Sequence, residues 1–252
     1  MTNPEASNHL ILYWIAFAIL LFPVLFFVKQ PYGKHFRIGW GPSISNRIGW
    51  IIMEMPSLII FTCFFMVSGN FKAPVTILFA LWFIHYFNRT LVFPFRIQTK
   101  GKKMPLIIAL FAIIFNVINA SFNGIALGKI PHFNAFTTPD FIRFGLGFLL
   151  FATGMFINLS ADNILIGLRK SSTKGYQIPQ KGLFKWVSCP NYLGEIIEWI
   201  GFATMAWNLA ALSFAIWTIV NLLPRAIDHH KWYRRYFVGY PEERMAIIPF
   251  IL

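Results

Sequence analysis

The sequence has little charge and almost no cysteine, and each shortage excludes a class of protein. Charged residues make up 12% of the 252 residues, and the two cysteines, Cys63 and Cys189, stand in an apolar run and before a proline. A disulfide framework or a cysteine metal site needs more cysteines at regular spacings, so we expect neither. The chain also lacks a linker, a low-complexity tract and a clear internal repeat. We therefore expect a single domain over residues 1–252.

Acidic residues are scarcer than basic ones, which leaves a formal net charge of +13. In a soluble protein this excess would suggest binding to nucleic acid. Basic segments that bind RNA normally belong to soluble folds, and no such fold can be separated from the apolar segments here. We therefore predict no nucleic-acid partner, and we assign the cations to membrane topology and to an anionic small ligand.

Apolar residues make up 57% of the chain, with 29 phenylalanines, and they form long runs. A helix of about 20 apolar residues spans the hydrocarbon core of a bilayer. The runs predict an all-α polytopic membrane protein with seven transmembrane helices: about Leu10–Val28, Ile48–Val67, Val75–Phe95, Pro105–Ala126, Phe141–Leu159, and two short spans between Pro190 and Pro224 that divide near Trp207. The N-terminus lacks the features of a cleaved signal, so the first span is expected to remain.

The loops between the predicted spans alternate in charge. Nearly all Lys and Arg fall in every second loop, whereas Lys72, Lys129 and Arg143 lie in the others. The positive-inside rule then places the basic loops and the C-terminus in the cytosol, and the N-terminus outside. A six-span arrangement would put a basic segment on the wrong side. We expect a bacterial inner membrane, with the endoplasmic reticulum membrane as the alternative.

Three polar residues share one face of the predicted helix that begins at Pro190. Asn191, Glu195 and Glu198 follow at i, i+4 and i+7, after a basic loop. A carboxylate in hydrocarbon costs at least a few kcal/mol, so such residues usually face a polar cavity. The alternative is a set of hydrogen bonds that only hold helices together. Three such residues on one face favour a ligand site.

Two more groups lie in the second and third spans. Trp50, Glu54 and Ser57 share one helical face. Glu54 either makes a structural hydrogen bond across helices, or acts as an acid that stays protonated in apolar surroundings and donates to a carbonyl. Tyr86 and Arg89 crowd the predicted cytosolic end of the third span. Taken alone, they indicate an interfacial anchor and an arginine that reaches toward the headgroups.

The remaining candidates lie in the C-terminal half. Asn158 and Asp162, four residues apart, indicate helix caps when taken alone. Tyr176 either stacks on a ring or fills its loop. The segment 225–235 has Arg, His, Lys and aromatic residues at helical spacing, which favours a phosphate-binding face. Its adjacent histidines point apart on a helix, so we predict no metal site. Without G-x-G-x-x-G or a Walker loop, a nucleotide would not bind to a Rossmann domain or a P-loop.

Six runs are long or specific enough to compare with known families: EMPS, HYFNRT, INLSADNILIGLRK, GYQIPQKGLFKWVSCPNYLGEIIEWIGFA, PRAIDHHKWY and YPEERMAIIPF. They resemble the steroid 5α-reductase family, the 3-oxo-5α-steroid 4-dehydrogenases. The resemblance implies seven transmembrane helices whose cytosolic loops form a non-Rossmann NADPH pocket, with residues 105–252 as the cofactor-binding part. It also implies hydride transfer from NADPH to C5 of a 3-oxo-Δ4-steroid, which reduces the Δ4 double bond.

The resemblance further implies roles for individual residues. Glu54 and Tyr86 correspond to the pair that hydrogen-bonds the C3 carbonyl of the steroid. The positions that correspond to NADPH contacts are Asn158, Asp162, Arg169, Tyr176, Asn191, Glu195, Arg225, His229 and Tyr233, to which Arg89 and Trp50 are added. Two positions depart from the family pattern. Met53 stands where glutamine is usual, which removes a hydrogen-bonding group near the substrate, and Asp228 stands where histidine is expected.

Under this interpretation the apolar steroid enters from the bilayer, membrane lipid surrounds the helices, and no obligate protein partner is expected. Other functions stay open: a related membrane reductase acting on a polyprenol or an enoyl-thioester, an S-adenosylmethionine-dependent membrane methyltransferase, or a transporter or structural protein. The cation-rich pocket favours NADPH over S-adenosylmethionine, because NADPH carries more phosphate charge.

Overall fold

The computed structural model describes residues 4–28, 39–99, 101–129, 137–171 and 175–252. Five cations of the predicted basic loops lie outside these ranges: Lys29, Lys34, Arg37, Lys100 and Lys174. The chain forms two compact units. We call Gln30–Phe141 the middle unit, and Ile142–Leu252 together with Met1–Lys29 the C-terminal unit.

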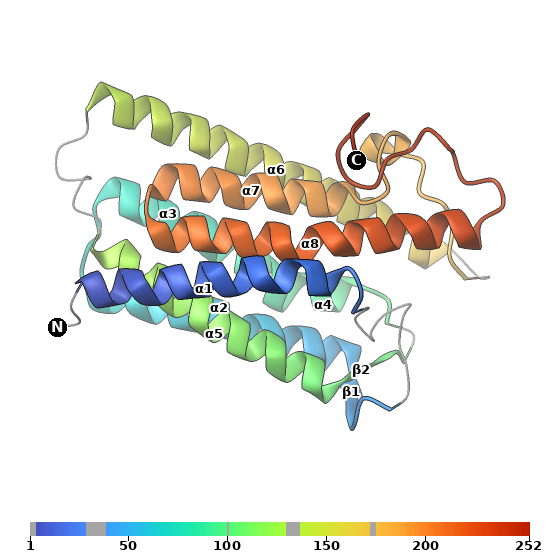
Figure 1. The fold of residues 1–252 in the computed structure, drawn as a ribbon, viewed down its shortest axis with the longest axis horizontal. Helices are drawn as coiled ribbons and strands as arrows, with labels where there is room; N and C mark the ends of the chain where they lie inside the picture. The colour runs from blue at the N-terminus through green and yellow to red at the C-terminus, as the bar shows by residue number, and fades with distance from the viewer. Residues whose placement is uncertain (1–3, 29–38, 100, 130–136, 172–174) are drawn as a thin grey trace. The chain divides into compact units, whose positions relative to one another are not determined.

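The described residues are mostly helical (Figure 1). The helices are α1 (Pro4–Leu25), α2 (Asn46–Ser68), α3 (Ala73–Phe87), α4 (Phe93–Arg96), α5 (Leu106–Gly128), α6 (Thr138–Ser171), α7 (Pro190–Ala206) and α8 (Leu209–Tyr236). A π-helical turn, η2 (Asn88–Val92), joins α3 to α4, so that Ala73–Arg96 forms one span. A short 3-10 helix, η4 (Gly182–Lys185), precedes α7.

Six of the helices in the described ranges are long and apolar enough to cross a membrane. The remaining long helix, α7, has 17 residues, which gives it a length of about 26 Å against a hydrocarbon core of about 30 Å. The predicted all-α polytopic membrane fold is confirmed.

The predicted boundary between the last two spans is also confirmed. Trp207 ends α7 in the left-handed region, with φ of 46°. The side chain of Asn208 then caps α8, because it accepts a hydrogen bond from the backbone N–H of Ala211 at 2.9 Å. This two-residue turn makes α7 and α8 an antiparallel helical hairpin.

Two other predicted boundaries are wrong. The helix α6 continues past Leu159 to Ser171, so Arg169 lies in its last turn and not in a loop. The helix α8 continues through Pro224 to Tyr236. A proline inside a helix removes one backbone hydrogen bond. Pro224 lies inside α8 and is buried. Because α8 has 28 residues and α7 has 17, only α7 is as short as both last spans were expected to be.

In the middle unit, α2 and α5 run side by side from a common start. A short antiparallel ladder of β1 (Ser43–Ser45) and β2 (Lys103–Pro105) joins them at their N-terminal ends. Further along, a Cβ placed on Gly124 would lie 2.7 Å from the Cβ of Phe64. The absence of a side chain there lets the two helices approach closely.

Aromatic rings fill the contact between α2 and α3. Phe65 and Phe79 stack with ring centroids 4.0 Å apart, and Phe61 stacks on Trp82 at 4.3 Å. Phe61 and Trp82 are fully buried. Offset and stacked rings of this size contribute to stability beyond the area they bury. The helix α2 therefore has α5 on one side and α3 on another.

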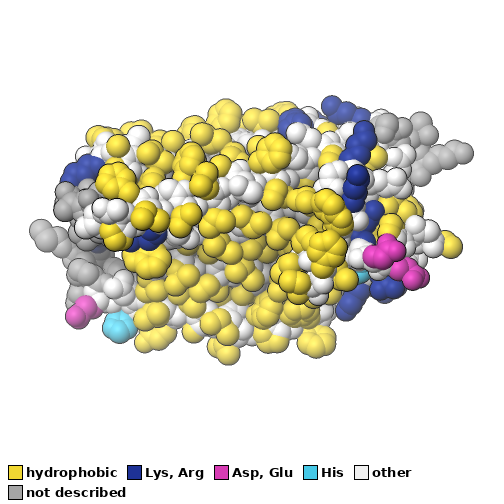
Figure 2. Space-filling view, turned by 90° about the horizontal axis from the view of Figure 1, so that it is seen from above, with side chains coloured by type: hydrophobic (Ala, Val, Ile, Leu, Met, Phe, Trp, Pro, Cys, Tyr) yellow, Lys and Arg dark blue, Asp and Glu magenta, His cyan; other side chains and the backbone are white. Residues whose placement is uncertain are grey.

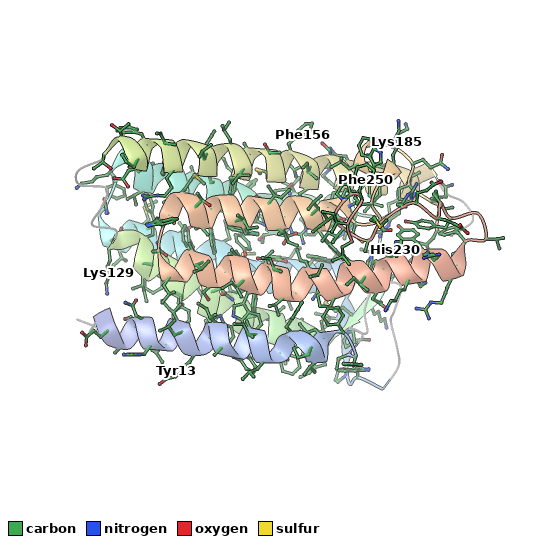
Figure 3. All side chains as sticks on the ribbon, turned by 45° about the horizontal axis from the view of Figure 1, so that its top comes forward. Tyr13, Lys129, Phe156, Lys185, His230 and Phe250 are labelled. Carbon is green, nitrogen blue, oxygen red and sulfur yellow. The ribbon has the colours of Figure 1, made fainter. Side chains whose placement is uncertain are left out.

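The C-terminal unit consists of α1, α6, α7 and α8. Trp14 of α1 lies against Trp217 of α8, with ring centroids 4.6 Å apart. On the outside, Tyr13 of α1 and Phe156 of α6 are 70% and 71% exposed and point away from the helices (Figure 3). Figure 2 shows hydrophobic side chains over most of the face in view, with Lys and Arg gathered toward one end. Such exposed apolar surface is typical of lipid contact.

The C-terminal tail folds back onto the loop before α7 (Figure 1). Val187 and Met245 form a parallel bridge. The backbone N–H of Met245 donates to the carbonyl of Trp186 at 2.9 Å, and the N–H of Ser188 donates to the carbonyl of Met245 at 2.8 Å. The loop that enters α7 is therefore fixed by a segment that lies 57 residues further along the chain, measured from Ser188 to Met245.

Candidate active site

The helices α6 and α7 touch through glycines. Each helix carries two glycines seven residues apart, which is two turns and therefore one face; they are Gly147 and Gly154, and Gly194 and Gly201. A Cβ on Gly194 would lie 2.5 Å from the backbone N of Asn158 and 2.6 Å from the carbonyl O of Gly154. The two backbones are in direct contact, as small residues allow between membrane helices.

This contact brings four of the predicted residues into one group, which we call the amide–carboxylate cluster. The Nδ2 of Asn158 donates to the carbonyl of Asn191 at 3.0 Å and to Oε2 of Glu195 at 3.5 Å. The Nδ2 of Asn191 donates to Oδ1 of Asp162 at 3.3 Å. Asn158 and Asp162 are buried, and the other two are half-buried. The interpretation of Asn158 and Asp162 as helix caps is wrong, because both lie inside α6 and face α7.

The third polar residue of the α7 face lies deeper. Glu198 is fully buried, and its backbone packs against Gly154 of α6. Asn191 and Glu195 therefore belong to the cluster, while Glu198 lies one turn further along α7.

The predicted residues of α8 occupy one face of that helix. Arg225, His229 and Tyr233 follow at intervals of four residues. The ring of His229 lies 5.6 Å from that of Tyr192, which is on α7 next to Asn191. This face of α8 therefore packs toward the start of α7. Arg225, His229 and Tyr233 are all half-buried.

Aromatic residues surround the end of α8. The ring of Tyr176 lies 5.1 Å from Trp232 and 6.3 Å from Tyr236, both nearly edge-on. Tyr176 thus contacts α8 with its ring, although it follows α6 in the chain. Arg169, in the last turn of α6, is exposed.

A hydrogen-bonded group that the sequence analysis did not predict fastens the tail. The hydroxyl of Ser188 lies 2.7 Å from Nδ1 of His230, 2.6 Å from the hydroxyl of Tyr240 and 3.1 Å from the carbonyl oxygen of Met245, so it is within hydrogen-bond distance of all three. We call these residues, with Arg244, the tail lock. His230, Lys185 and Phe250 lie at the same end of this unit (Figure 3).

Arg244 completes the tail lock. It is buried, its guanidinium donates to the carbonyl of Pro179 at 3.0 Å, and its charge lies 4.9 Å from the centre of the Tyr240 ring. Burial raises the pKa of Tyr240 above its ordinary value of 10, and the hydrogen bonds from Ser188 and Arg244 oppose that rise. Tyr240 is therefore a neutral phenol at neutral pH. The run YPEERMAIIPF, which contains Tyr240 and Arg244, was the signal in the sequence for this group.

In the middle unit, Trp50 and Arg89 come together. The Arg89 guanidinium carbon lies 4.7 Å from the centre of the Trp50 ring and 5.0 Å from that of Phe93. Arg89 lies in the π-helical turn, where the N–H of Phe93 donates to the carbonyl of Asn88, five residues back. The next residue, Pro94, has no N–H to donate, and wide turns of this kind are frequent at functional sites.

Contacts one turn before and one turn after Glu54 show which part of α3 lies opposite it. On α2, Glu54 lies between Trp50 and Ser57 on one face. Along α3 and the turn η2 that follows it, Tyr86 lies between Trp82 and Arg89. Trp50 contacts Arg89, and the carbonyl of Ser57 accepts a hydrogen bond from Nε1 of Trp82 at 3.0 Å. The helices are antiparallel, so Glu54 and Tyr86 lie at the same level of the α2–α3 pair. Tyr86 is buried and Glu54 is half-buried.

Comparison with known proteins shows to which family the chain belongs. Residues 102–252 match a family described as 3-oxo-5-alpha-steroid 4-dehydrogenase. The chain is 40% identical to "Steroid 5-alpha-reductase DET2" of Solanum lycopersicum, over 99% of this chain and 98% of the relative. It is 38% identical to "3-oxo-5-alpha-steroid 4-dehydrogenase 1" of Homo sapiens, over 87% of this chain and 85% of the relative.

The chain belongs to the 3-oxo-5-alpha-steroid 4-dehydrogenase family.

Membership in the steroid dehydrogenase family makes this multi-pass membrane protein an oxidoreductase and implies a nicotinamide cofactor. The match over residues 102–252 includes the whole amide–carboxylate cluster and the tail lock. Within the described ranges, no three His, Cys, Asp or Glu side chains gather as a metal site.

Proposed function

We propose that this chain reduces the Δ4 double bond of a 3-oxo-Δ4-steroid with NADPH and forms the 5α-3-oxosteroid. Its identity of 40% to a steroid 5-alpha-reductase, over 99% of the chain, is the observation that carries this proposal. Hydride adds to C5, which takes both electrons, and a proton adds to C4.

The amide–carboxylate cluster suits the cofactor. Amide groups donate and accept hydrogen bonds, and carboxylates accept them, so Asn158, Asn191 and Glu195 match the donors and acceptors of a nicotinamide carboxamide. Arg169 and Arg225 supply positive charge for phosphate oxygens. NADPH held by these residues would supply the hydride. Asp162, Tyr176, His229 and Tyr233 complete the set proposed to contact the cofactor, with Trp50 and Arg89 as further members.

Glu54 and Tyr86 are the proposed catalytic pair. A ketone conjugated to the alkene makes C5 electrophilic, and negative charge gathers on the C3 oxygen as hydride arrives. Glu54, as the neutral acid, and Tyr86 donate hydrogen bonds to that oxygen. A donor of this kind in a water-excluded site is worth about 3 kcal/mol, or roughly 100-fold in rate. The arrangement of Glu54 and Tyr86 at one level of the α2–α3 pair supports this role.

The two ligands are proposed to arrive from different phases. The steroid is apolar, so it enters from the bilayer, and lipid contacts the exposed apolar faces of the helices. NADPH is charged and enters from the side that carries the basic loops, which we take as the cytosol, with the C-terminus cytosolic and the N-terminus outside. Labelling of Lys185→Cys from the cytosolic side and of Lys129→Cys from the opposite side is expected, and the reverse pattern would refute this orientation.

The test of the proposed reaction is NADPH oxidation by the purified protein with one substrate at a time. A 3-oxo-Δ4-steroid should be turned over to the 5α-product, while a polyprenal and an enoyl-thioester should not. Preferential turnover of either of those would establish the related-reductase alternative. Binding of S-adenosylmethionine with no binding of NADPH would establish a methyltransferase.

Variants of the pair test its role. Glu54→Gln and Tyr86→Phe should each lower kcat about 100-fold while the Kd for NADPH stays within twofold of wild type. Loss of NADPH binding with normal chemistry in either variant would contradict the assignment.

A further inference from the structure

The helix α2 accepts a hydrogen bond from α5 at Met53, the residue before the proposed catalytic acid. The Nδ2 of Asn116, on α5, donates to the carbonyl of Met53 at 2.6 Å. Met53 directly precedes Glu54 in the chain. A hydrogen bond from another helix to that carbonyl fixes both the height and the rotation of this turn of α2.

The two sides of this turn have different neighbours. Met53 is buried in a cluster with Met104 and Ala109, so its side chain faces β2 and α5. The family pattern implies a position near the substrate, whereas the Met53 side chain points away from the α3 side of α2 on which Glu54 lies. Glu54 lies about 100° further round α2. One turn earlier, the Trp50 ring contacts both the Met53 cluster and Arg89 of η2, and one turn later the carbonyl of Ser57 accepts a hydrogen bond from Trp82 of α3. Asn116 therefore holds α2 on its α5 side, while Glu54 lies on the side that faces α3, which carries Tyr86.

This turn of α2 needs such a support. Pro56 lies inside α2, and without an N–H it leaves the carbonyl of Ile52 without its helical donor. The hydrogen-bond ladder is therefore interrupted beside Glu54, where a helix bends most easily. The bond from Asn116 to the neighbouring carbonyl stiffens the interrupted turn.

The burial of Asn116 makes the bond specific. Asn116 is 6% exposed and faces the interior of the middle unit. A buried amide that loses its partner is costly, so its position against the Met53 carbonyl is well determined. Asn119, one turn further along α5, is also buried, but its Nδ2 donates to the carbonyl of Phe115 in its own helix. Asn119 provides a matched control.

We propose that Asn116 is a positioning residue for Glu54: through the Met53 carbonyl it holds the acid at the height from which it donates to the steroid C3 oxygen. This inference rests on the proposed function, because it assigns Glu54 the catalytic role. Asn116 itself touches neither substrate nor cofactor in this account. Its loss displaces the acid by a fraction of an ångström to about 1 Å, and displacements of this size cost up to about 100-fold in rate.

The experiment measures steroid reduction and NADPH binding by Asn116→Leu and Asn119→Leu. Asn116→Leu should lower kcat about 10- to 100-fold, with KM for NADPH unchanged, whereas Asn119→Leu should keep kcat within threefold. Asn116→Gln, which keeps the donor, should recover part of the loss. Equal effects of the two leucine variants would overturn the proposal. If Asn116→Leu does not fold, Asn116→Ser removes the reach across the helices without adding apolar bulk, and the same outcomes apply.

A double-mutant cycle with Glu54→Asp separates positioning from general stability. If Asn116 acts through Glu54, Asn116→Leu should have little further effect once the acid has been shortened, so the two losses should be strongly non-additive. Additive losses would overturn the proposal. Should Glu54→Asp and Glu54→Gln both retain full activity, the proposed function of Glu54 fails instead, and the two failures are distinguishable.

Discussion

The contact between α6 and α7 makes a sharp prediction for Gly194→Ala. An alanine Cβ at this position would lie 2.5 Å from the backbone N of Asn158, so the helices must separate by about 1 Å to restore normal packing. The bonds of the amide–carboxylate cluster, at 3.0 to 3.5 Å, would then exceed hydrogen-bond length. Overpacking of this kind destabilises a protein by about 1–3 kcal/mol.

The same separation of the two helices should weaken the binding of NADPH. If two hydrogen bonds to NADPH worth about 1 kcal/mol each are lost, the Kd rises about 30-fold. The assay is titration of tryptophan fluorescence with NADPH in detergent, together with a thermal unfolding scan.

Gly145→Ala provides the control on α6. A Cβ there would meet nothing within 4 Å, and alanine favours a helix over glycine by about 1 kcal/mol. This variant should bind NADPH like wild type and unfold at the same or a higher temperature. If Gly194→Ala binds NADPH as tightly as Gly145→Ala, the account of the cluster is refuted.

Two further predictions concern the tail lock. Ser188→Ala removes the hydrogen bonds with His230, Tyr240 and Met245. The loss of about 1 kcal/mol of unfolding free energy should lower Tm by about 2–4 °C. An unchanged Tm would contradict the role of this hydroxyl. The pKa of Tyr240 is raised in the folded protein, so its contribution to stability is complete below pH 10 and is lost as pH rises through the folded pKa. Tyr240→Phe should flatten the alkaline decline of Tm, and an identical decline in both proteins would be the contrary result.

The helices were predictable because the signals for them are local. Apolar runs and the Trp207-Asn208 turn predict the spans from neighbouring residues alone. The end of α6 was not predicted, because polar residues such as Asn158 are satisfied by partners on another helix. The end of α8 was not predicted, because this helix continues through Pro224. An asparagine side chain can cap its own helix or donate a hydrogen bond to another helix, and the sequence alone does not show which. The close glycine contact between α6 and α7 places Asn158 within hydrogen-bond distance of α7.

The site was predictable only in part for a similar reason. Spacing and resemblance select Asn158, Asp162, Asn191 and Glu195, and the structure brings these four together. The tail lock depends on contacts such as that between Ser188 and Tyr240, 52 residues apart, which no local pattern reveals. The support of α2 by Asn116 is hidden in the same way, because it involves a backbone carbonyl, which every residue possesses.

The most direct test of the proposed reaction follows the hydride itself. NADPH carrying deuterium at the transferred position of the nicotinamide should be incubated with the wild-type protein and a 3-oxo-Δ4-steroid, and the product analysed by mass spectrometry and NMR. The account predicts one deuterium at C5 in the 5α configuration, and its near absence with Glu54→Gln at equal saturation with NADPH. Deuterium at another carbon, a 5β-product, or full transfer by Glu54→Gln would contradict it.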